Sequence, residues 1–146
     1  MRALLFNVNA QRTGYPSQVW TPFWEGYDPE AGDEQPLFAS QKDDSSRRAT
    51  RAWVHQAGQL SRDGIDVYAE WLGRARRHGI EGWVSMRMND LHNVEDENHS
   101  LHSAFWKRHP EFRRVPYRGE LRDQALDFGR AAVREYSLRL IEEIGR

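Results

Sequence analysis

The fold is decided by two apolar stretches that end in polar residues, Gly82-Trp83-Val84-Ser85-Met86-Arg87-Met88-Asn89-Asp90-Leu91-His92 and Ala3-Leu4-Leu5-Phe6-Asn7-Val8-Asn9. Parallel α/β proteins place catalytic and binding residues at the carboxyl ends of their strands and in the loops that follow. The two stretches therefore predict strands that run parallel and bring their polar ends to one shared site.

Two helices are expected between these strands. Ser45 and Ser46 can cap a helix over residues 47–61, and Asp66 can cap a second helix that runs to residue 78. Gly79 is suited to end the second helix, because the left-handed conformation there costs glycine little. The second strand follows at once, and this order of helix, short turn and strand is half of a parallel βαβ crossover.

The remaining segments are interpreted as follows. Residues 27–36 are acidic, contain two prolines and predict a loop, whereas residues 91–123 predict a long functional loop with a short helix near residues 100–107. Residues 125–128 resemble a third short strand. From about Arg130 onward, an apolar stripe predicts an amphipathic last helix.

Length and composition limit the classes of function. The 146 residues suit one domain, and a net charge of −1 gives no broad positive field, so nucleic acid is not an expected partner. Cysteine is absent, which excludes disulfides and thiolate metal sites. No stretch has the roughly 20 apolar residues of a membrane span, and the first residues indicate a strand in place of a signal peptide. We expect a soluble protein whose compartment the sequence leaves open.

Four polar side chains are predicted to converge at the carboxyl ends of the strands. Alternation along a strand puts Asn7 and Asn9 on one face of the first strand, and Arg87 and Asn89 on one face of the second. There they can bind the hydroxyls of a substrate. The alternative is a buried polar network that satisfies only itself.

Asp90 and His92 are the candidate catalytic residues. They occupy the first turn after the second strand, where a carboxylate and an imidazole can exchange a proton or bind hydroxyls. The alternatives are a turn cap for Asp90 and a surface position for His92.

The segment between residues 15 and 27 is dense in aromatic rings, among them Tyr15, Trp20 and Trp24. Such rings can stack on the apolar faces of sugars, or they can fold under the loop as a small satellite core.

A metal site is a further alternative, because His92, His99 and His102 lie in one acidic stretch. The spacing matches no known zinc motif, so we expect neither a metal nor another cofactor.

Several segments together resemble bacterial glycoside hydrolases with a TIM-barrel catalytic domain, and the resemblance covers nearly the whole chain. They are residues 7–12, 15–17, 109–111 and 126–144 and, most specifically, Gly79-Ile80-Glu81-Gly82-Trp83-Val84-Ser85-Met86-Arg87-Met88-Asn89-Asp90-Leu91-His92. The resemblance implies a (β/α)₈ barrel that acts on polysaccharide, with Arg87, Asn89, Asp90 and His92 at matching pocket positions.

A whole barrel needs roughly 250 residues, so we expect residues 1–146 to form a single incomplete barrel segment of two or three parallel βα units with long βα loops. The leading hypothesis is a hydrolase fragment, inactive alone, because the carboxylate pair of a glycosidase is not complete in it. The alternatives are a non-catalytic carbohydrate-binding protein and a metal-dependent hydrolase. Exposed sheet edges also predict self-association.

Overall fold

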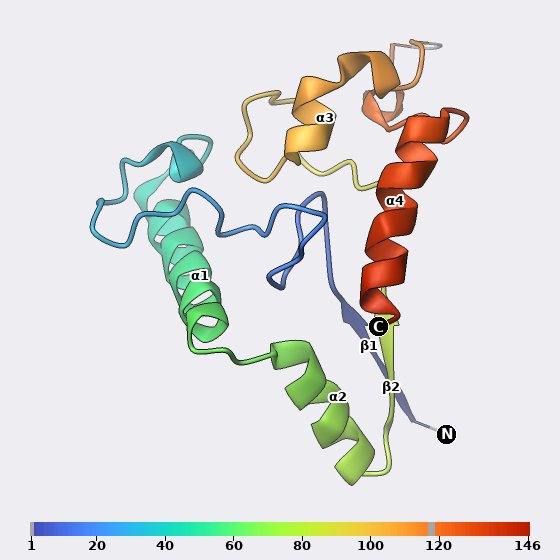
Figure 1. The fold of residues 1–146 in the computed structure, drawn as a ribbon. Helices are drawn as coiled ribbons and strands as arrows, with labels where there is room; N and C mark the ends of the chain where they lie inside the picture. The colour runs from blue at the N-terminus through green and yellow to red at the C-terminus, as the bar shows by residue number, and fades with distance from the viewer. Residues whose placement is uncertain (1, 117–118) are drawn as a thin grey trace.

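The computed structural model describes residues 2–116 and 119–146 (Figure 1). These described residues form two strands and four α-helices, in the order β1 (Ala3–Asn7), α1 (Asp44–Arg62), α2 (Val67–Arg77), β2 (Glu81–Ser85), α3 (Ala104–Arg108) and α4 (Ala131–Ile144). Short 3₁₀ helices occupy Pro36–Phe38, Pro110–Phe112 and Leu121–Gln124. In these described ranges, no helix is both long and apolar enough to cross a membrane.

The two strands pair in parallel, as predicted, with Leu5 opposite Trp83. The connection through α1 and α2 makes this pair an α/β unit, and α2 packs against one face of the sheet (Figure 1). On that face, the rings of Phe6 and Trp71 stack with their centroids 5.7 Å apart. The opposite face is open: Leu5 is 71% exposed and Trp83 is 55% exposed.

The expected ends of α2 are confirmed. The Asp66 carboxylate accepts hydrogen bonds from the backbone N–H groups of Tyr68 and Ala69. At the other end, Gly79 has a φ of 65°, and the N–H of the next residue donates to the carbonyl oxygen of Ala75. These bonds satisfy backbone groups that a helix end leaves without partners.

The other boundaries differ from the predictions. The cap of α1 is Asp43, whose carboxylate accepts from the N–H of Ser46, so this helix begins earlier than expected. The short third helix begins later, after its cap Ser103. Strand β2 starts at Glu81 and stops at Ser85, which leaves the polar residues after it in a loop.

The third strand expected at residues 125–128 is not found in the described part of the chain. Leu126 instead makes a single antiparallel bridge with Arg113. The described residues therefore contain one parallel β-α-β unit followed by a mainly helical region, and the prediction of a further βα unit there is wrong.

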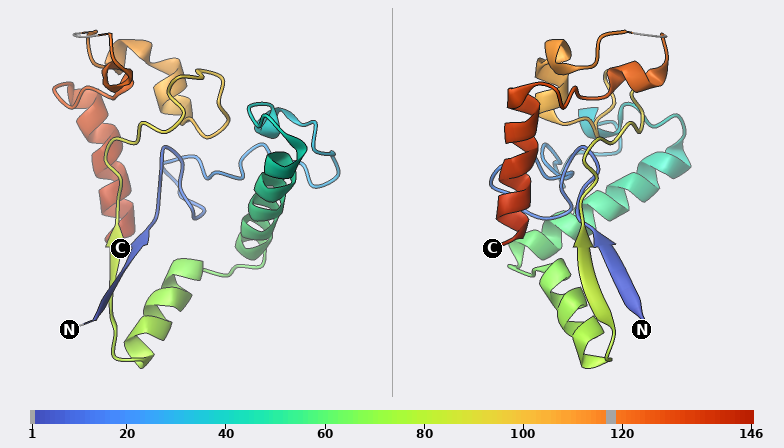
Figure 2. Two further views of the ribbon diagram at one scale, coloured as in Figure 1. Left: turned by 180° about the vertical axis from the view of Figure 1, so that it is seen from behind. Right: turned by 90° about the vertical axis from the view of Figure 1, so that its right-hand side faces the viewer.

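Two hydrophobic clusters lie away from the sheet, one on α1 and the other between α3 and α4. In Figures 1 and 2, α1 and α4 lie on opposite sides of the loop that follows β1. The buried residues of the first cluster are Phe23, Leu37, Phe38 and Val54, and those of the second are Val94, Trp106, Leu126 and Val133.

Candidate functional site

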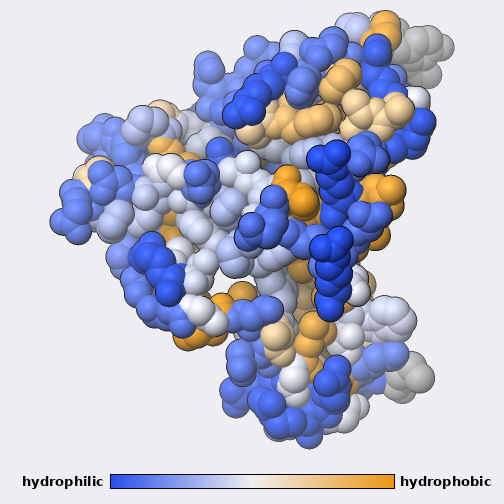
Figure 3. All heavy atoms as spheres, viewed as in Figure 1, coloured by the Kyte–Doolittle hydropathy of each residue, from blue (hydrophilic) through white to orange (hydrophobic). Residues whose placement is uncertain are grey.

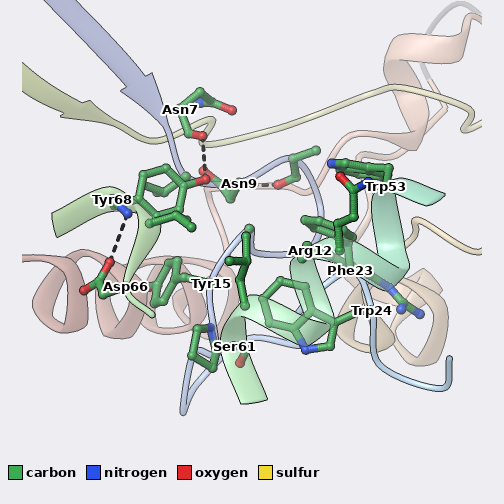
Figure 4. Close-up of a pocket in the computed structure, with 18 of the residues that line it drawn as sticks. Asn7, Asn9, Arg12, Tyr15, Phe23, Trp24, Trp53, Ser61, Asp66 and Tyr68 are labelled. Atoms are coloured by element: carbon green, nitrogen blue, oxygen red, sulfur yellow. Dashed lines mark hydrogen bonds between the residues drawn. The ribbon is translucent and has the colours of Figure 1, made fainter. Parts of the chain in front are cut away.

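A cavity of about 400 Å³ lies between the loop after β1, α1 and the start of α2. The hollow between α1, α2 and the strands is visible in Figure 3. Figure 4 shows Tyr15 and Tyr68 on one side of it and Trp24 and Trp53 on the other. The aromatic lining residues are Tyr15, Phe23, Trp24, Trp53, Tyr68 and Trp71, and the polar ones include Asn7, Gln56, Ser61 and Asp66.

Helix α1 supplies one wall from a single face. Trp53, Gln56 and Leu60 follow the spacing of one helical stripe, and all three line the cavity. The ring of Trp53 stacks on Phe23 with the centroids 3.8 Å apart, yet Trp53 stays about half exposed. An apolar stripe of this kind is typical of a packed core, and the glutamine within it is a sequence signal of another use.

Tyr15 is held in place by the last turn of α4. Its hydroxyl donates to a carboxylate oxygen of Glu143 at 2.8 Å, and the N–H of Gln18 donates to the other oxygen at 2.6 Å. Burial and the neighbouring carboxylate raise the pKa of Tyr15, so the phenol stays protonated. Its ring meets Tyr68 edge to face with the centroids 6.2 Å apart. Helix α4 therefore fixes one aromatic wall of the cavity.

The other two rings predicted to bind substrate behave differently from each other. Trp24 lines the cavity and packs edge to face on Phe23, at 5.0 Å between centroids. Trp20 is buried away from it: the indole N–H donates to the carbonyl oxygen of Tyr136 at 3.0 Å, and the ring stacks on Tyr136 at 4.5 Å. The structure thus gives Trp20 the alternative role, packing under the loop.

Asn9 extends the sheet through its side chain. The Asn9 amide donates to the carbonyl oxygen of Arg87 at 2.9 Å and accepts from the N–H of Arg87 at 2.9 Å, and its second hydrogen goes to the carbonyl oxygen of Ala10. Asn9 is 3% exposed, so these bonds occupy the amide. Asn7 is exposed, and its carbonyl oxygen accepts from the Tyr68 hydroxyl at 3.1 Å (Figure 4).

The side-chain amide of Asn89 pairs with the backbone of another segment in the same way. Its amide donates to the carbonyl oxygen of Leu126 at 2.9 Å and accepts from the N–H of Leu126 at 3.0 Å. The four predicted polar residues are therefore divided: Asn7, Asn9 and Arg87 line the aromatic cavity, whereas Asn89 lies on an adjacent hollow.

That adjacent hollow, about 460 Å³ and open to solvent, contains Asp90 and His92. The Asp90 carboxylate is 3% exposed and accepts from His92 Nδ1 at 2.9 Å and from the Arg87 guanidinium at 3.0 Å. Burial acts to raise the pKa of Asp90, but hydrogen bonds from His92 and Arg87 outweigh it and lower the pKa. The carboxylate stays ionised and fixes Nδ1 of His92 as the protonated nitrogen.

The His92 ring is 72% exposed, and Nε2 has no hydrogen-bond partner among the described residues. A neutral imidazole held this way presents the Nε2 lone pair to any molecule in the hollow. The arrangement can accept a proton and return it.

His99 and His102, two of the three histidines named as possible metal ligands, make contacts within their own loop. His102 is buried, its Nε2 lies 3.0 and 2.9 Å from the carbonyl oxygens of Asn93 and Asp96, and its ring stacks on Trp106. Within residues 2–116 and 119–146, no group of three or more histidine or acidic residues is arranged to hold a metal ion. The metal centre built from His92, His99 and His102 is therefore not formed.

Comparisons of the sequence with models of protein families and with curated proteins give no match.

Proposed function

We propose that this chain binds carbohydrate in its aromatic cavity, as the binding part of a barrel like that of glycoside hydrolases. The observation that carries this proposal is the lining: aromatic rings surround a space of about 400 Å³, with amide, hydroxyl and carboxylate groups among them. Sugars have apolar ring faces and hydroxyl edges, and this mixed lining suits both.

The barrel part of the proposal is supported by the sheet. In a (β/α)₈ barrel, helices cover the outer face of the strands and bulky side chains fill the interior. Helix α2 covers one face here, and the opposite face presents Leu5 and Trp83. The cavity also begins at the carboxyl end of β1, which is the end where such barrels bind substrate.

Two tryptophans that are each about half exposed allow a matched test of binding. Trp53 lines the cavity, whereas Trp83 lies on the open face of the sheet. Burying roughly 60 Å² of a Trp53 face against a sugar is worth about 1.5 kcal/mol, or about a tenfold change in affinity. Calorimetry with a panel of neutral oligosaccharides should show this loss for Trp53→Ala and none for Trp83→Ala. Equal affinities in all three proteins, or no binding by the wild type, would refute the proposal.

A second candidate function, proton transfer by His92, rests on the Asp90–His92 pair. Glycoside hydrolysis uses two carboxylates about 5–10 Å apart, and among the described residues that line the cavity Asp66 has the one carboxylate. The chemistry that we propose therefore uses the imidazole: His92 accepts or returns the proton, while Asp90 orients it. Arg87 lines both the cavity and the hollow, so a chain of sugars bound in the first can extend over the second.

This role separates from binding in one experiment. His92→Gln removes the lone pair at Nε2 but leaves the cavity intact, so sugar affinity should be unchanged while the release of reducing ends falls by about 10²–10⁴-fold. Asp90→Asn should lower turnover less and leave affinity unchanged. Wild-type protein that binds sugars without turnover would refute the catalytic role and leave the binding role standing.

A further inference from the structure

We propose that strand β1 pairs antiparallel with β1 of a second copy of the chain, with the two-fold axis at Leu5. The resulting sheet has four strands, in the order β2, β1, β1 of the partner and β2 of the partner. This inference concerns the outer edge of β1 and does not depend on sugar binding in the cavity. It competes with the barrel part of the proposed function, because a barrel would pair that edge with a further parallel strand.

The backbone of β1 shows which groups are available at that edge. The carbonyl oxygen of Arg2 accepts from β2, and the N–H of Val8 donates to β2, so the even-numbered residues face β2. In a regular strand the alternate residues then face outward: Ala3, Leu5 and Asn7. Consistent with this, the Asn7 carbonyl oxygen accepts from Tyr68, which lies outside the sheet. By this alternation, the N–H and C=O groups of Ala3 and Leu5 point away from β2.

A two-fold axis at Leu5 matches these groups. Leu5 then lies opposite Leu5 of the other copy, and Ala3 lies opposite Asn7. In an antiparallel ladder, directly opposed residues of the hydrogen-bonded kind exchange both of their N–H···O=C bonds. The outward groups of Ala3, Leu5 and Asn7 therefore all find their place in one register, and the Asn7 carbonyl oxygen has a second lone pair for the new bond.

The outer edge of β1 also lacks the features by which proteins prevent two strand edges from pairing. Proteins discourage such pairing with charged residues, prolines or bulges. Residues 3–7 contain no charge and no proline, and Leu4 and Leu5 are both exposed. The outer edge of β2 is less suited, because it offers Gly82 and Val84, and a glycine weakens a strand. We therefore assign the pairing to β1.

The absence of cysteine in the chain permits a direct test. Opposed residues of a hydrogen-bonded pair have Cα atoms about 5.5 Å apart, which a disulfide can bridge. Leu5→Cys should therefore form a covalent dimer on mild oxidation. Trp83→Cys is the matched control, because Trp83 pairs with Leu5 inside one copy but would lie about 14 Å from its equivalent across the axis.

Sedimentation equilibrium at tens of micromolar protein provides the second readout. Wild-type chain should be dimeric, Leu5→Lys should weaken the dimer at least tenfold by bringing two like charges together, and Val115→Lys, at another exposed apolar position, should not. Sugar affinity should be the same in all three, because Leu5 and Val115 lie outside the cavity. A monomeric wild type, cross-linking at Trp83 instead of Leu5, or a dimer indifferent to Leu5→Lys would each overturn the proposal.

Discussion

Replacing Asn9 by alanine tests whether this asparagine holds the fold or binds a ligand. The amide of Asn9 takes the place of a backbone unit: it donates to the carbonyl oxygen of Arg87 and accepts from the N–H of Arg87, both at 2.9 Å. The variant leaves both groups of Arg87 without these partners beside a buried residue. We therefore expect Asn9→Ala to lower the free energy of unfolding.

The magnitude follows from these bonds. Two hydrogen bonds to backbone contribute about 1 kcal/mol each, and leaving a partly buried donor and acceptor unsatisfied costs about 1 kcal/mol more. The expected loss is about 3 kcal/mol, which for a chain of this length lowers the melting temperature by about 10 °C. Urea unfolding followed by circular dichroism measures it, and the denaturant slope should stay unchanged.

Two further variants control for this interpretation. Asn9→Asp keeps an acceptor for the N–H of Arg87 but turns a carboxylate oxygen toward the carbonyl oxygens of Arg87 and Ala10 at a buried position, so it should be destabilised at least as much as Asn9→Ala. Asn7→Ala removes an exposed amide whose contacts to Ser85 are 3.3 and 3.4 Å long, and should cost less than about 0.5 kcal/mol. The reasoning would be refuted if Asn9→Ala unfolded like the wild type and lost sugar affinity.

Three other predictions follow from single contacts. Hydrogen bonds from Ser17, Gln18 and Tyr15 outweigh burial and lower the pKa of Glu143. The Glu143 carboxylate therefore stabilises the fold above about pH 4.3, and this stabilisation is lost as the pH falls through the lowered pKa. Glu143→Gln should cost about 1 kcal/mol at pH 7, and urea titrations should show a smaller loss of stability in acid for this variant. Burial lowers the pKa of His102, so the unfolded chain binds the proton more tightly than the folded one, and stability should fall as the pH drops below about 6.5. The difference between the unfolding midpoints at pH 7.5 and pH 5.5 should be smaller for His102→Gln than for the wild type. An equal difference in the two proteins would contradict this. A Cβ at Gly14 would lie 2.5 Å from the Tyr68 hydroxyl, so Gly14→Ala should cost about 1–3 kcal/mol in thermal unfolding, whereas Gly32→Ala, with nothing within 4 Å, should leave the melting temperature unchanged.

The elements that could be predicted are those set by neighbours in the sequence. Asp66 caps its own helix, and Gly79 ends it a few residues later, so local chemistry fixes both ends of α2. The parallel direction of the strands followed because α2 leads straight into β2. The prediction of a third strand was wrong because the backbone of Leu126 pairs with the side-chain amide of Asn89, a residue distant in the sequence.

The wall of the cavity that α1 supplies could not be predicted, because it uses the same pattern as a core. Trp53 and Leu60 lie on an apolar stripe of α1, and such a stripe packs inside most proteins. Whether it faces a cavity depends on the spacing between α1 and α2, which only the folded chain sets. Trp20 and Trp24 show the same limit within one loop: four residues apart, one ring packs under the loop and the other lines the cavity.

Sugar binding and proton transfer depend on different kinds of contact, so one can be lost without the other. The contacts among Arg87, Asp90 and His92 join residues two or three positions apart, so the turn after β2 forms them by itself. The cavity instead requires α1, α2 and the loop after β1 to be placed relative to one another. Partial loosening of α1 should therefore abolish sugar binding before it disturbs the proton-transfer pair, because packing between distant segments is lost before contacts within one turn.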